Sequence, residues 1–279
     1  MIKIRNLSYI YSKGTPFEKK ALDNINLEIN NNSFVGLIGH TGSGKSTLVQ
    51  HFNGLLKPDF GEIYINQKNI WAEKSEIYKY RFKVGLVFQY PEHQLFEETV
   101  FKDIAFGPKN MGLSLEDIKS RVNWAINIVG LSSEFLNKSP FELSGGQKRK
   151  VALAGIISMD PEILILDEPT AGLDPKSKNL LLENIKSYQN KNNKIIILIS
   201  HNMDDVAQFC DNIILMNQSR IYLTGSVKKV FCQVDKLESV GINVPTVSRI
   251  FNLLKNKGYN IKTNITTVDE AVDYLSDFK

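Results

Sequence analysis

Glycine, lysine and hydroxyl side chains stand together in one short stretch, GHTGSGKST, from Gly39 to Thr47. Glycines at this spacing let backbone N–H groups converge on phosphate oxygens, and the lysine and serine that follow serve the terminal phosphates and Mg²⁺. Lys45 and Ser46 would take these roles, and Thr47 would reach the α-phosphate. An ordinary glycine turn is the alternative, but a buried apolar run precedes the stretch and helical spacing follows it, which favours a phosphate site at a helix N-terminus. The residues predicted to hold a nucleotide are Gly39, His40, Thr41, Gly42, Ser43, Gly44, Lys45, Ser46 and Thr47.

Two adjacent acidic residues end a second apolar run, EILILDE. The run places Asp167 at the carboxyl end of a buried strand, where its carboxylate can hold Mg²⁺ through water. Glu168 comes next and is placed to polarise an attacking water. The alternative is a pair of solvated carboxylates at a strand end.

Gln89 and His201 also come directly after apolar runs, KVGLVF and KIIILIS. A single Gln is weak evidence by itself, and a lone His is more often structural than catalytic. The four strands, however, would all finish at one edge of a sheet, which is where ligands bind in open α/β folds. This position favours functional roles for both side chains.

A second stretch suited to anions, FELSGGQKRK, runs from Phe141 to Lys150. Its serine and two glycines stand just before an expected helix start, whose N-terminus attracts negative charge. A helix cap without further function is the alternative. The chain thus carries two phosphate-binding stretches, which raises the question of whether it holds two nucleotides or half of a larger site.

The composition narrows the class of protein. In 279 residues, 42% are hydrophobic, which is enough for a sizeable core and argues against disorder. Lys and Arg number 34 against 30 Asp and Glu, and this net charge of +4 is well below that of a dedicated nucleic-acid binder. Cys210 and Cys232 indicate neither a disulfide framework nor a zinc site, so a reduced, cytoplasmic setting is expected. No segment resembles a signal peptide or a membrane span, so a membrane role is expected to come through a partner.

The order of the apolar patterns predicts an α/β fold in two parts. Residues 1–225 begin with alternating strands of an antiparallel sheet, continue with buried parallel strands, and carry a helical region at about 90–160. In that region Ser114 is the expected cap of a helix that ends at Gly130. Residues 226–279 form a small helical extension. A packing appendage and an oligomerisation surface remain equally open for the extension.

Taken in order, GHTGSGKST, VFQ, LSGGQ, ILILDEPTAGLD and LISH resemble the ATP-binding cassette (ABC) ATPases over about residues 1–225. The resemblance implies a P-loop NTPase fold, with a RecA-like core, an antiparallel β-subdomain and a helical subdomain. It also implies ATP hydrolysis with ATP and Mg²⁺ as cofactors. Within this pattern Tyr11 matches the aromatic residue that stacks on adenine.

The resemblance also implies a role for each polar strand-end residue. Ser46, Gln89 and Asp167 would serve Mg²⁺, and Gln89 would also sense a membrane partner. Glu168 would be the catalytic base, and His201 would bridge the γ-phosphate and the catalytic loop.

In this family two cassettes pack head to tail, which would explain the second phosphate-binding stretch. Asp174 would belong to the loop that crosses between subunits. The residues that would face the partner's ATP are Ser144, Gly145, Gly146 and Gln147. One chain would therefore carry two half-sites.

The segment after Gln89, YPEHQLFEETVFKDIAFGPKNMGLS, resembles more narrowly the ATPases of energy-coupling factor (ECF) transporters, which drive uptake of vitamins or transition-metal ions. PEHQLFEETV and DEPTAGLDPKSK look like the second of the two related cassettes of these systems. The implied partners are another cassette in a heterodimer (a homodimer is the alternative), a transmembrane coupling subunit and a substrate-capture membrane protein, with no nucleic acid. The implied place is peripheral, on the cytoplasmic face of the cell membrane, and the extension at 226–279 would add to the dimer contact.

The same segment predicts a groove for a basic amphipathic helix, which the resemblance implies to be a coupling helix of the transmembrane subunit. Its predicted lining is Tyr90, Glu92, Leu95, Phe96, Glu97 and Glu98. A solvated charged loop is the alternative. Two other functions are alternatives to transport: that of a soluble ABC protein acting on nucleic acid or ribosomes, and that of a nucleotide switch without hydrolysis. The weak net charge disfavours the first, and the presence of both Glu168 and His201 disfavours the second.

Overall fold

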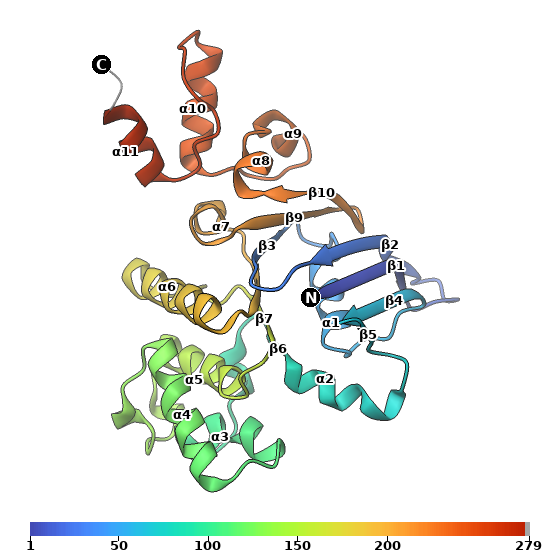
Figure 1. The fold of residues 1–279 in the computed structure, drawn as a ribbon, viewed down its shortest axis with the longest axis vertical. Helices are drawn as coiled ribbons and strands as arrows, with labels where there is room; N and C mark the ends of the chain where they lie inside the picture. Colours follow the sequence, from blue (N-terminus) through green and yellow to red (C-terminus); the bar gives the residue numbers. More distant parts are fainter. Residues whose placement is uncertain (277–279) are drawn as a thin grey trace.

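A computed structural model describes residues 1–276 and shows two sheets flanked by helices (Figure 1). The smaller, antiparallel sheet has the order β2-β1-β4-β5, and the larger has the order β10-β9-β3-β8-β7-β6. The strands are β1 Ile2–Tyr11, β2 Lys19–Ile29, β3 Phe34–Ile38, β4 Phe60–Ile65, β5 Lys68–Asn69, β6 Val84–Val87, β7 Ile163–Asp167, β8 Ile195–Ile199, β9 Asn212–Asn217 and β10 Arg220–Ser226. The predicted α/β fold, with an antiparallel sheet first and parallel strands after it, is confirmed.

The parallel strands form because their apolar runs are covered on both faces. All residues of β3, β6 and β8 are buried. Successive residues of β7 enter opposite cores: Leu164 and Leu166 pack with the helices of the middle of the chain, while Ile163 and Ile165 pack toward the antiparallel sheet. β10, which pairs antiparallel with β9, was not predicted: its residues are alternately exposed and half-buried, so it lacks the run of buried apolar side chains that marks the other strands of this sheet.

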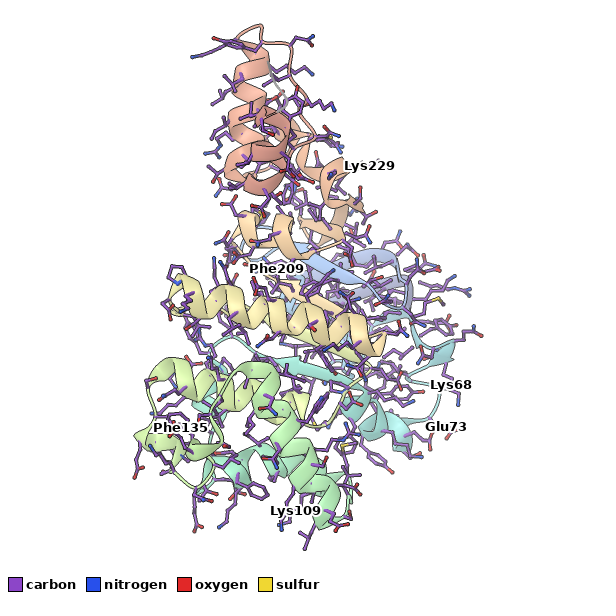
Figure 2. The ribbon with its side chains drawn as sticks, turned by 60° about the vertical axis from the view of Figure 1, so that its left-hand side comes forward. Lys68, Glu73, Lys109, Phe135, Phe209 and Lys229 are labelled. Atoms are coloured by element: carbon purple, nitrogen blue, oxygen red, sulfur yellow. The ribbon has the colours of Figure 1, made fainter. Side chains whose placement is uncertain are left out.

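Helices flank both sheets (Figure 1). They are α1 Lys45–Phe52, α2 Ile77–Lys83, α3 Val100–Asn110, α4 Leu115–Val129, α5 Gly145–Ile157, α6 Pro175–Asn192 and α7 Met203–Phe209, with short 3₁₀ turns at Lys74–Glu76, Pro91–Gln94, Ser133–Phe135 and Pro140–Glu142. Helices α3, α4 and α5 lie together at one end of the molecule (Figure 1). As predicted, the Ser114 hydroxyl caps α4, and Gly130 ends it in the left-handed conformation. In Figure 2 the helices that carry Lys109 and Phe135 lie opposite the end of the molecule that carries Lys229.

The last helices are α8 Val227–Phe231, α9 Val234–Glu238, α10 Thr246–Asn256 and α11 Val268–Ser276. Val247 and Phe251 of α10 form a small core with Ile265 and Ala271. The Thr267 hydroxyl caps α11, and the Glu270 carboxylate accepts hydrogen bonds from the backbone and hydroxyl of Thr266. The predicted extension reaches residue 279, and residues 277–279 lie outside the described part of the chain. Within residues 1–276, helices of the length and hydropathy that a bilayer requires are absent.

Candidate active site

One polar cavity of about 410 Å³ lies at the carboxyl ends of the parallel strands. It receives the glycine loop that follows β3, the acidic pair at the end of β7, and His201, two residues beyond the end of β8. Its lining residues are Tyr11, Lys19, Ala21, Thr41, Gly42, Gly44, Lys45, Ser46, Thr47, Gln89, Asp167, Glu168, Ile199 and His201. The side chains predicted from separate stretches of sequence therefore meet at one edge of the sheet.

The loop before α1 needs glycine where its backbone passes closest to other chain segments. Gly44 has a φ of 103°, and a β-carbon added there would lie 2.5 Å from the carbonyl oxygen of Ala21. Gly39 is equally confined, since an added β-carbon would lie 2.4 Å from the Met216 carbonyl oxygen. The loop can therefore pass over the end of the sheet only with glycine at these positions.

Three of the predicted nucleotide residues support the loop from outside the cavity lining. The His40 ring lies 2.8 Å from the Asn217 side-chain oxygen and 2.8 Å from the Thr41 carbonyl oxygen. Ser43 is fully buried, and Gly39 is covered by Met216. These residues hold the shape of the loop, whereas Lys45, Ser46 and Thr47 face the cavity.

The Lys45 ammonium donates hydrogen bonds to the carbonyl oxygens of Gly39, at 2.6 Å, and of His40, at 3.0 Å. Burial lowers the pKa of Lys45, and the nearby carboxylates of Asp167 and Glu168 oppose that shift. The charge is thus held at the mouth of the loop, between neutral carbonyls and two acids. A phosphate placed there would meet a desolvated cation, which strengthens the attraction.

Asp167 lies beside Lys45 and Ser46 in the cavity. Burial raises the pKa of Asp167, while the Lys45 charge, His201 and a hydrogen bond from Ser46 partly offset the rise. Magnesium prefers oxygen ligands and is commonly held by one or two carboxylates together with substrate phosphates. The Ser46 hydroxyl, the Asp167 carboxylate and the Gln89 side-chain amide line one cavity and fit that requirement. Within residues 1–276, clusters of three His, Cys, Asp or Glu side chains that could hold a metal ion are absent.

Glu168 is held in an uncommon conformation. Its φ is 50°, in the left-handed region that few non-glycine residues adopt, although turn residues elsewhere in this chain, such as Asn66 and Asn193, adopt it as well. Its carboxylate accepts a hydrogen bond of 2.7 Å from the His201 backbone, and the His201 Nε2 atom lies 3.9 Å from the same oxygen. Burial raises the pKa of Glu168, although His201 opposes the shift. A carboxylate fixed in place with a raised pKa is suited to accept a proton near neutral pH.

Tyr11, rather than Tyr9, lines the cavity. The Tyr11 hydroxyl lies 3.3 Å from the Thr47 hydroxyl, and its ring meets the edge of Tyr9 at 4.9 Å between centroids. Tyr9 in turn packs at 4.8 Å against His51, which is fully buried in α1. The Tyr11 ring is therefore supported from behind while its other side remains open to a ligand.

Lys19, Ala21 and Ile199 also line the cavity but were not predicted. Lys19 is paired with Tyr11 in the register of β1 and β2, so the two residues stand side by side at the cavity. The position of Lys19 beside Tyr11 depends on the register of the β1–β2 hairpin. That register shifts several times along the two strands, so it could not be predicted from the sequence.

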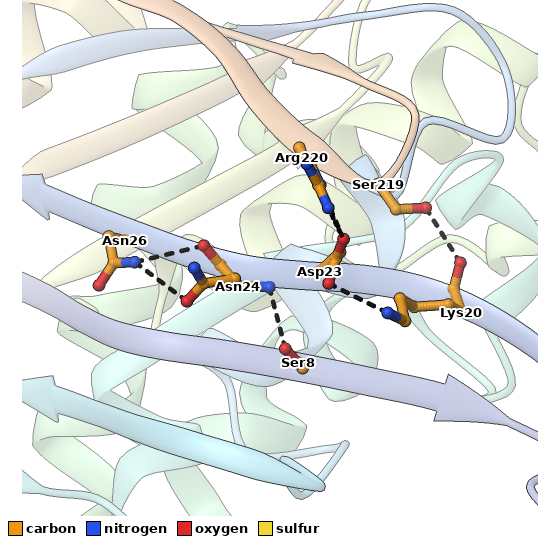
Figure 3. A network of polar contacts seen from close by, with 7 residues as sticks. All are labelled: Ser8, Lys20, Asp23, Asn24, Asn26, Ser219 and Arg220. Atoms are coloured by element: carbon orange, nitrogen blue, oxygen red, sulfur yellow. Dashed lines mark hydrogen bonds and ion pairs between the residues drawn. The ribbon is translucent and has the colours of Figure 1, made fainter.

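A polar network anchors β2 to the turn between β9 and β10 (Figure 3). Asp23 accepts hydrogen bonds from Arg220, at 2.7 Å, and from Lys20, at 3.2 Å. The Ser219 hydroxyl donates to the Lys20 carbonyl oxygen at 3.0 Å. These contacts fix the start of β2, and with it the adenine end of the predicted site.

Ser144 and Asp174 lie outside this cavity, as do Gly145, Gly146 and Gln147. Ser144 caps α5 in a capping box: its backbone N–H donates to the Gln147 side chain at 2.9 Å, and its hydroxyl accepts from Gln147 at 3.4 Å. Asp174 caps α6 by accepting from the Ser177 backbone at 3.0 Å. Neither stretch therefore contributes a side chain to the lining of the cavity in its own chain.

The predicted groove residues separate into two groups. Leu95 and Phe96 line an apolar hollow of about 330 Å³ that α3, α5 and α2 also border. Tyr90 and three glutamates lie outside its lining. Glu92 forms an ion pair with Arg149, and Glu98 pairs with Lys102. Glu97 is half-buried beside Asp103, whose pKa burial raises.

Comparison with known proteins supports the resemblance from three directions. A model of the ABC transporter family matches residues 22–171. The energy-coupling factor transporter ATP-binding protein EcfA2 of Caldanaerobacter subterraneus subsp. tengcongensis is 54% identical, over 98% of this chain and 96% of its own length. The protein of the same name from Clostridium tetani is 56% identical, over 97% of this chain and 94% of its own.

Two solved structures share the fold. The cbiO1 protein of Clostridium perfringens, described as part of the ABC transporter complex cbiONQ, has a TM-score of 0.76 and 38% identity, covering 91% of this chain and 98% of its own. The ATP-binding cassette MJ0796, as a dimer in a post-hydrolysis state with ADP and Pi, has a TM-score of 0.74 and 28% identity, covering 81% of this chain and 99% of its own. The chain therefore belongs to the ABC transporter family and, within it, to the energy-coupling factor transporter ATP-binding proteins of the EcfA2 type.

Proposed function

We propose that this chain binds and hydrolyses ATP as a subunit of an energy-coupling factor importer, and powers uptake of vitamins or transition-metal ions through membrane partners. The observation that carries the proposal is the single cavity in which Lys45, Asp167, Glu168 and His201 meet. The names of the relatives support the transport role.

The residues of the cavity have distinct tasks in hydrolysis. Backbone N–H groups of the loop and the N-terminus of α1 bind the phosphates, and Lys45 exchanges its carbonyl partners for phosphate oxygens. Mg²⁺, held by Ser46, Asp167 and Gln89, would neutralise charge on the β- and γ-phosphates. Tyr11 stacks on the adenine ring.

Glu168 is the general base. It accepts a proton from the water whose oxygen forms a bond to the γ-phosphorus, while the bond from that phosphorus to the β-phosphate oxygen breaks. The His201 backbone N–H holds the Glu168 carboxylate. The His201 side chain would bridge the γ-phosphate and the catalytic loop. The products are ADP and inorganic phosphate.

The residues outside the cavity serve the ATP of a partner cassette. Ser144, Gly145, Gly146 and Gln147 present the N-terminus of α5, and Asp174 lies on the adjoining loop. Two chains packed head to tail would then close on two nucleotides, so that ATP joins them and hydrolysis lets them separate. We infer a heterodimer with a related second cassette, with a homodimer as the alternative.

The apolar groove at Leu95 and Phe96 takes a coupling helix of a transmembrane subunit, with Tyr90, Glu92, Glu97 and Glu98 around it. The assembly includes a substrate-capture membrane protein and lies on the cytoplasmic face of the cell membrane. The helical extension at 226–279 adds to the dimer contact. Nucleic acid has no part in it.

The test is the ATP-dependent pairing of a Glu168→Gln variant. This change removes the base and leaves the phosphate contacts intact, so the variant should bind ATP and accumulate as a closed dimer in size-exclusion chromatography with light scattering. A Lys45→Ala, Glu168→Gln double variant is the control. It should stay unpaired, because the loss of the Lys45 charge weakens its binding of ATP. Turnover at the parent rate, or a strictly monomeric ATP complex both alone and with its cognate cassette, would overturn the proposal.

A further inference from the structure

Arg149 is a nearly buried arginine just beyond the first turn of α5, with 5% of its surface exposed. Its Nε atom donates to Glu92 Oε2 at 3.0 Å, and its Nη2 atom donates to Glu92 Oε1 at 2.6 Å. Two parallel hydrogen bonds of this kind fix the plane of the guanidinium as well as its distance. Arg149 and Glu92 are therefore held as one rigid unit.

Glu92 lies in the short 3₁₀ turn Pro91–Gln94, which follows Gln89 and leads into the apolar groove. Burial works against its charge, but the hydrogen bonds and charge of Arg149 outweigh burial and lower the pKa of Glu92. The guanidinium carbon also lies 5.9 Å from the centre of the Tyr90 ring. The pair thus ties the segment after Gln89 to α5, although neither residue lines the nucleotide cavity.

The loop that leads to Asp174 meets the same arginine. A β-carbon added at Gly172 would lie 3.9 Å from Arg149 Nη1, which is buried and has no hydrogen-bond acceptor among residues 1–276. One added at Gly146 would lie 3.1 Å from the Leu173 side chain. The first turn of α5 and the loop therefore pack against each other beside the ion pair.

We propose that the Glu92–Arg149 ion pair is a positioning device for the partner's nucleotide. It holds the tip of α5 and the loop before Asp174 in one orientation relative to the segment after Gln89. A shift of the segment after Gln89 is then transmitted through the Arg149 guanidinium to Ser144, without involving the glycine loop of the same chain. This inference rests on the proposed function and adds to it the residues that link the groove to the partner's ATP.

The test compares three substitutions in a Glu168→Gln background: Arg149→Gln, Glu92→Gln and, as a matched control, Arg121→Gln. Arg121 also forms an ion pair in the helical region, at 3.2 Å from Asp160, but lies on α4 away from the loop. Each variant is measured for affinity of the unpaired chain toward a fluorescent ATP analogue and for the ATP concentration that drives pairing.

Arg149→Gln and Glu92→Gln should leave analogue affinity within about twofold and weaken ATP-driven pairing by about tenfold, the size of coupling expected for contacting charged residues. Combining Arg149→Gln with Glu92→Gln should weaken ATP-driven pairing no more than either change alone, because the first change already breaks the ion pair. In the Glu168 parent, kcat should fall while KM for ATP stays the same. Arg121→Gln should change none of these quantities.

Three results would overturn the inference: Arg149→Gln pairing like its background, a parallel loss of analogue affinity, or multiplicative losses in the double variant. If Arg149→Gln proved unstable, Glu92→Gln would decide alone, since its carboxylate is the more exposed partner. Failure of the Glu168→Gln background to pair with ATP would instead remove the proposed function, and this inference with it.

Discussion

Asp167 and Glu168 are neighbours in sequence, and burial raises the pKa of both. Their different neighbouring side chains nevertheless suit them to different roles. Asp167 faces the Lys45 charge and the Ser46 hydroxyl, which oppose the rise that burial causes in its pKa and so favour the carboxylate form that binds a cation. Glu168 faces His201 and sits in a strained backbone conformation. The strain and the desolvated charge both cost stability, which is common where a side chain is held for catalysis.

Because the buried Glu168 carboxylate destabilises the folded state, replacing it should raise the stability of the protein by an amount that depends on pH. A carboxyl whose pKa is higher in the folded state destabilises that state above its unfolded pKa, and the penalty fades as pH falls through this window. Nucleotide-free Glu168→Gln should therefore melt a few degrees above the parent at pH 7, with the difference shrinking toward pH 4. Differential scanning calorimetry across this pH range measures it. A lower Tm at pH 7 would show that the carboxylate stabilises the fold.

Lys19 should contribute modestly to nucleotide affinity, because it lines the cavity beside Tyr11 and has no ion pair within the described residues. We expect Lys19→Ala to weaken ATP binding about two- to fivefold, the size typical of exposed ion pairs, and to leave kcat at saturating ATP unchanged. Lys45→Ala should cost far more, because that charge is desolvated. Equilibrium titrations at low and high salt separate the two, since only the Lys19 effect should fade with salt. A Lys19→Ala effect as large as that of Lys45→Ala would contradict this ranking.

At the scale of elements, strands and helix ends with local signals could be predicted from sequence. EILILD and KIIILIS specify β7 and β8 through their own apolar side chains, and Ser114 and Gly130 mark the ends of α4 by local hydrogen bonding and φ. Contacts between distant segments could not be predicted. Glu92 appeared as a free groove acid because nothing near it in sequence indicates Arg149. Lys19 was missed because its place depends on the register of two irregular strands.

The apolar groove predicts which part of the 90–98 segment holds the membrane subunit. Phe96 lines the groove and packs edge-on against Phe106 at 5.0 Å, while Glu98 is already paired with Lys102 at the surface. Phe96→Asp should abolish co-purification with the transmembrane subunit in mild detergent and leave the ATPase of the isolated chain active. Glu97→Lys with Glu98→Lys should do the same if basic residues on the partner helix approach this rim.

Phe17 provides the matched control for the groove. It is also an exposed aromatic, but it lies in the turn between β1 and β2. Phe17→Asp should therefore assemble normally. Normal assembly of Phe96→Asp, with quantitative mass spectrometry of the bound subunits as the readout, would remove the groove assignment.

At the scale of the whole molecule, the C-terminal helices stand apart from the groove and extend the end of the molecule near α7 (Figures 1 and 2). Helix α10 is tied to α7 by polar contacts, because the Thr246 backbone and hydroxyl donate to Asp204 at 2.9 and 3.1 Å. Within the C-terminal helices, Lys228 of α8 pairs with Glu270 of α11. Asp204 belongs to α7, which begins just after His201. The position of α10 is therefore linked to the edge of the catalytic cavity.

The outer faces of α10 and α11 decide between an appendage and an oligomerisation surface. Their inner residues form the small core, but five large apolar side chains remain exposed: Ile250, Leu253, Val268, Val272 and Leu275. The spacing i, i+4, i+7 puts Val268, Val272 and Leu275 on one side of α11. An appendage that only packed on its own chain would have no use for such an exposed apolar stripe, which is typical of interaction sites. We therefore favour the oligomerisation surface. Such a contact would not require ATP, whereas the contact of Ser144 with the partner's nucleotide does. It would therefore keep two cassettes together after hydrolysis.

Leu253→Glu with Val272→Glu tests this separation. Both side chains are more than half exposed, so the charges should leave the Tm nearly unchanged. ATP-free self-association, or association with the cognate cassette, should weaken by about tenfold or more in sedimentation equilibrium, because burying two unpaired carboxylates opposes contact. In a Glu168→Gln background, saturating ATP should still restore pairing, since the contact of Ser144 with the partner's nucleotide lies elsewhere. If the double variant associated without ATP as the parent does, the extension would be a packing appendage, and the two cassettes would depend on nucleotide alone to stay together.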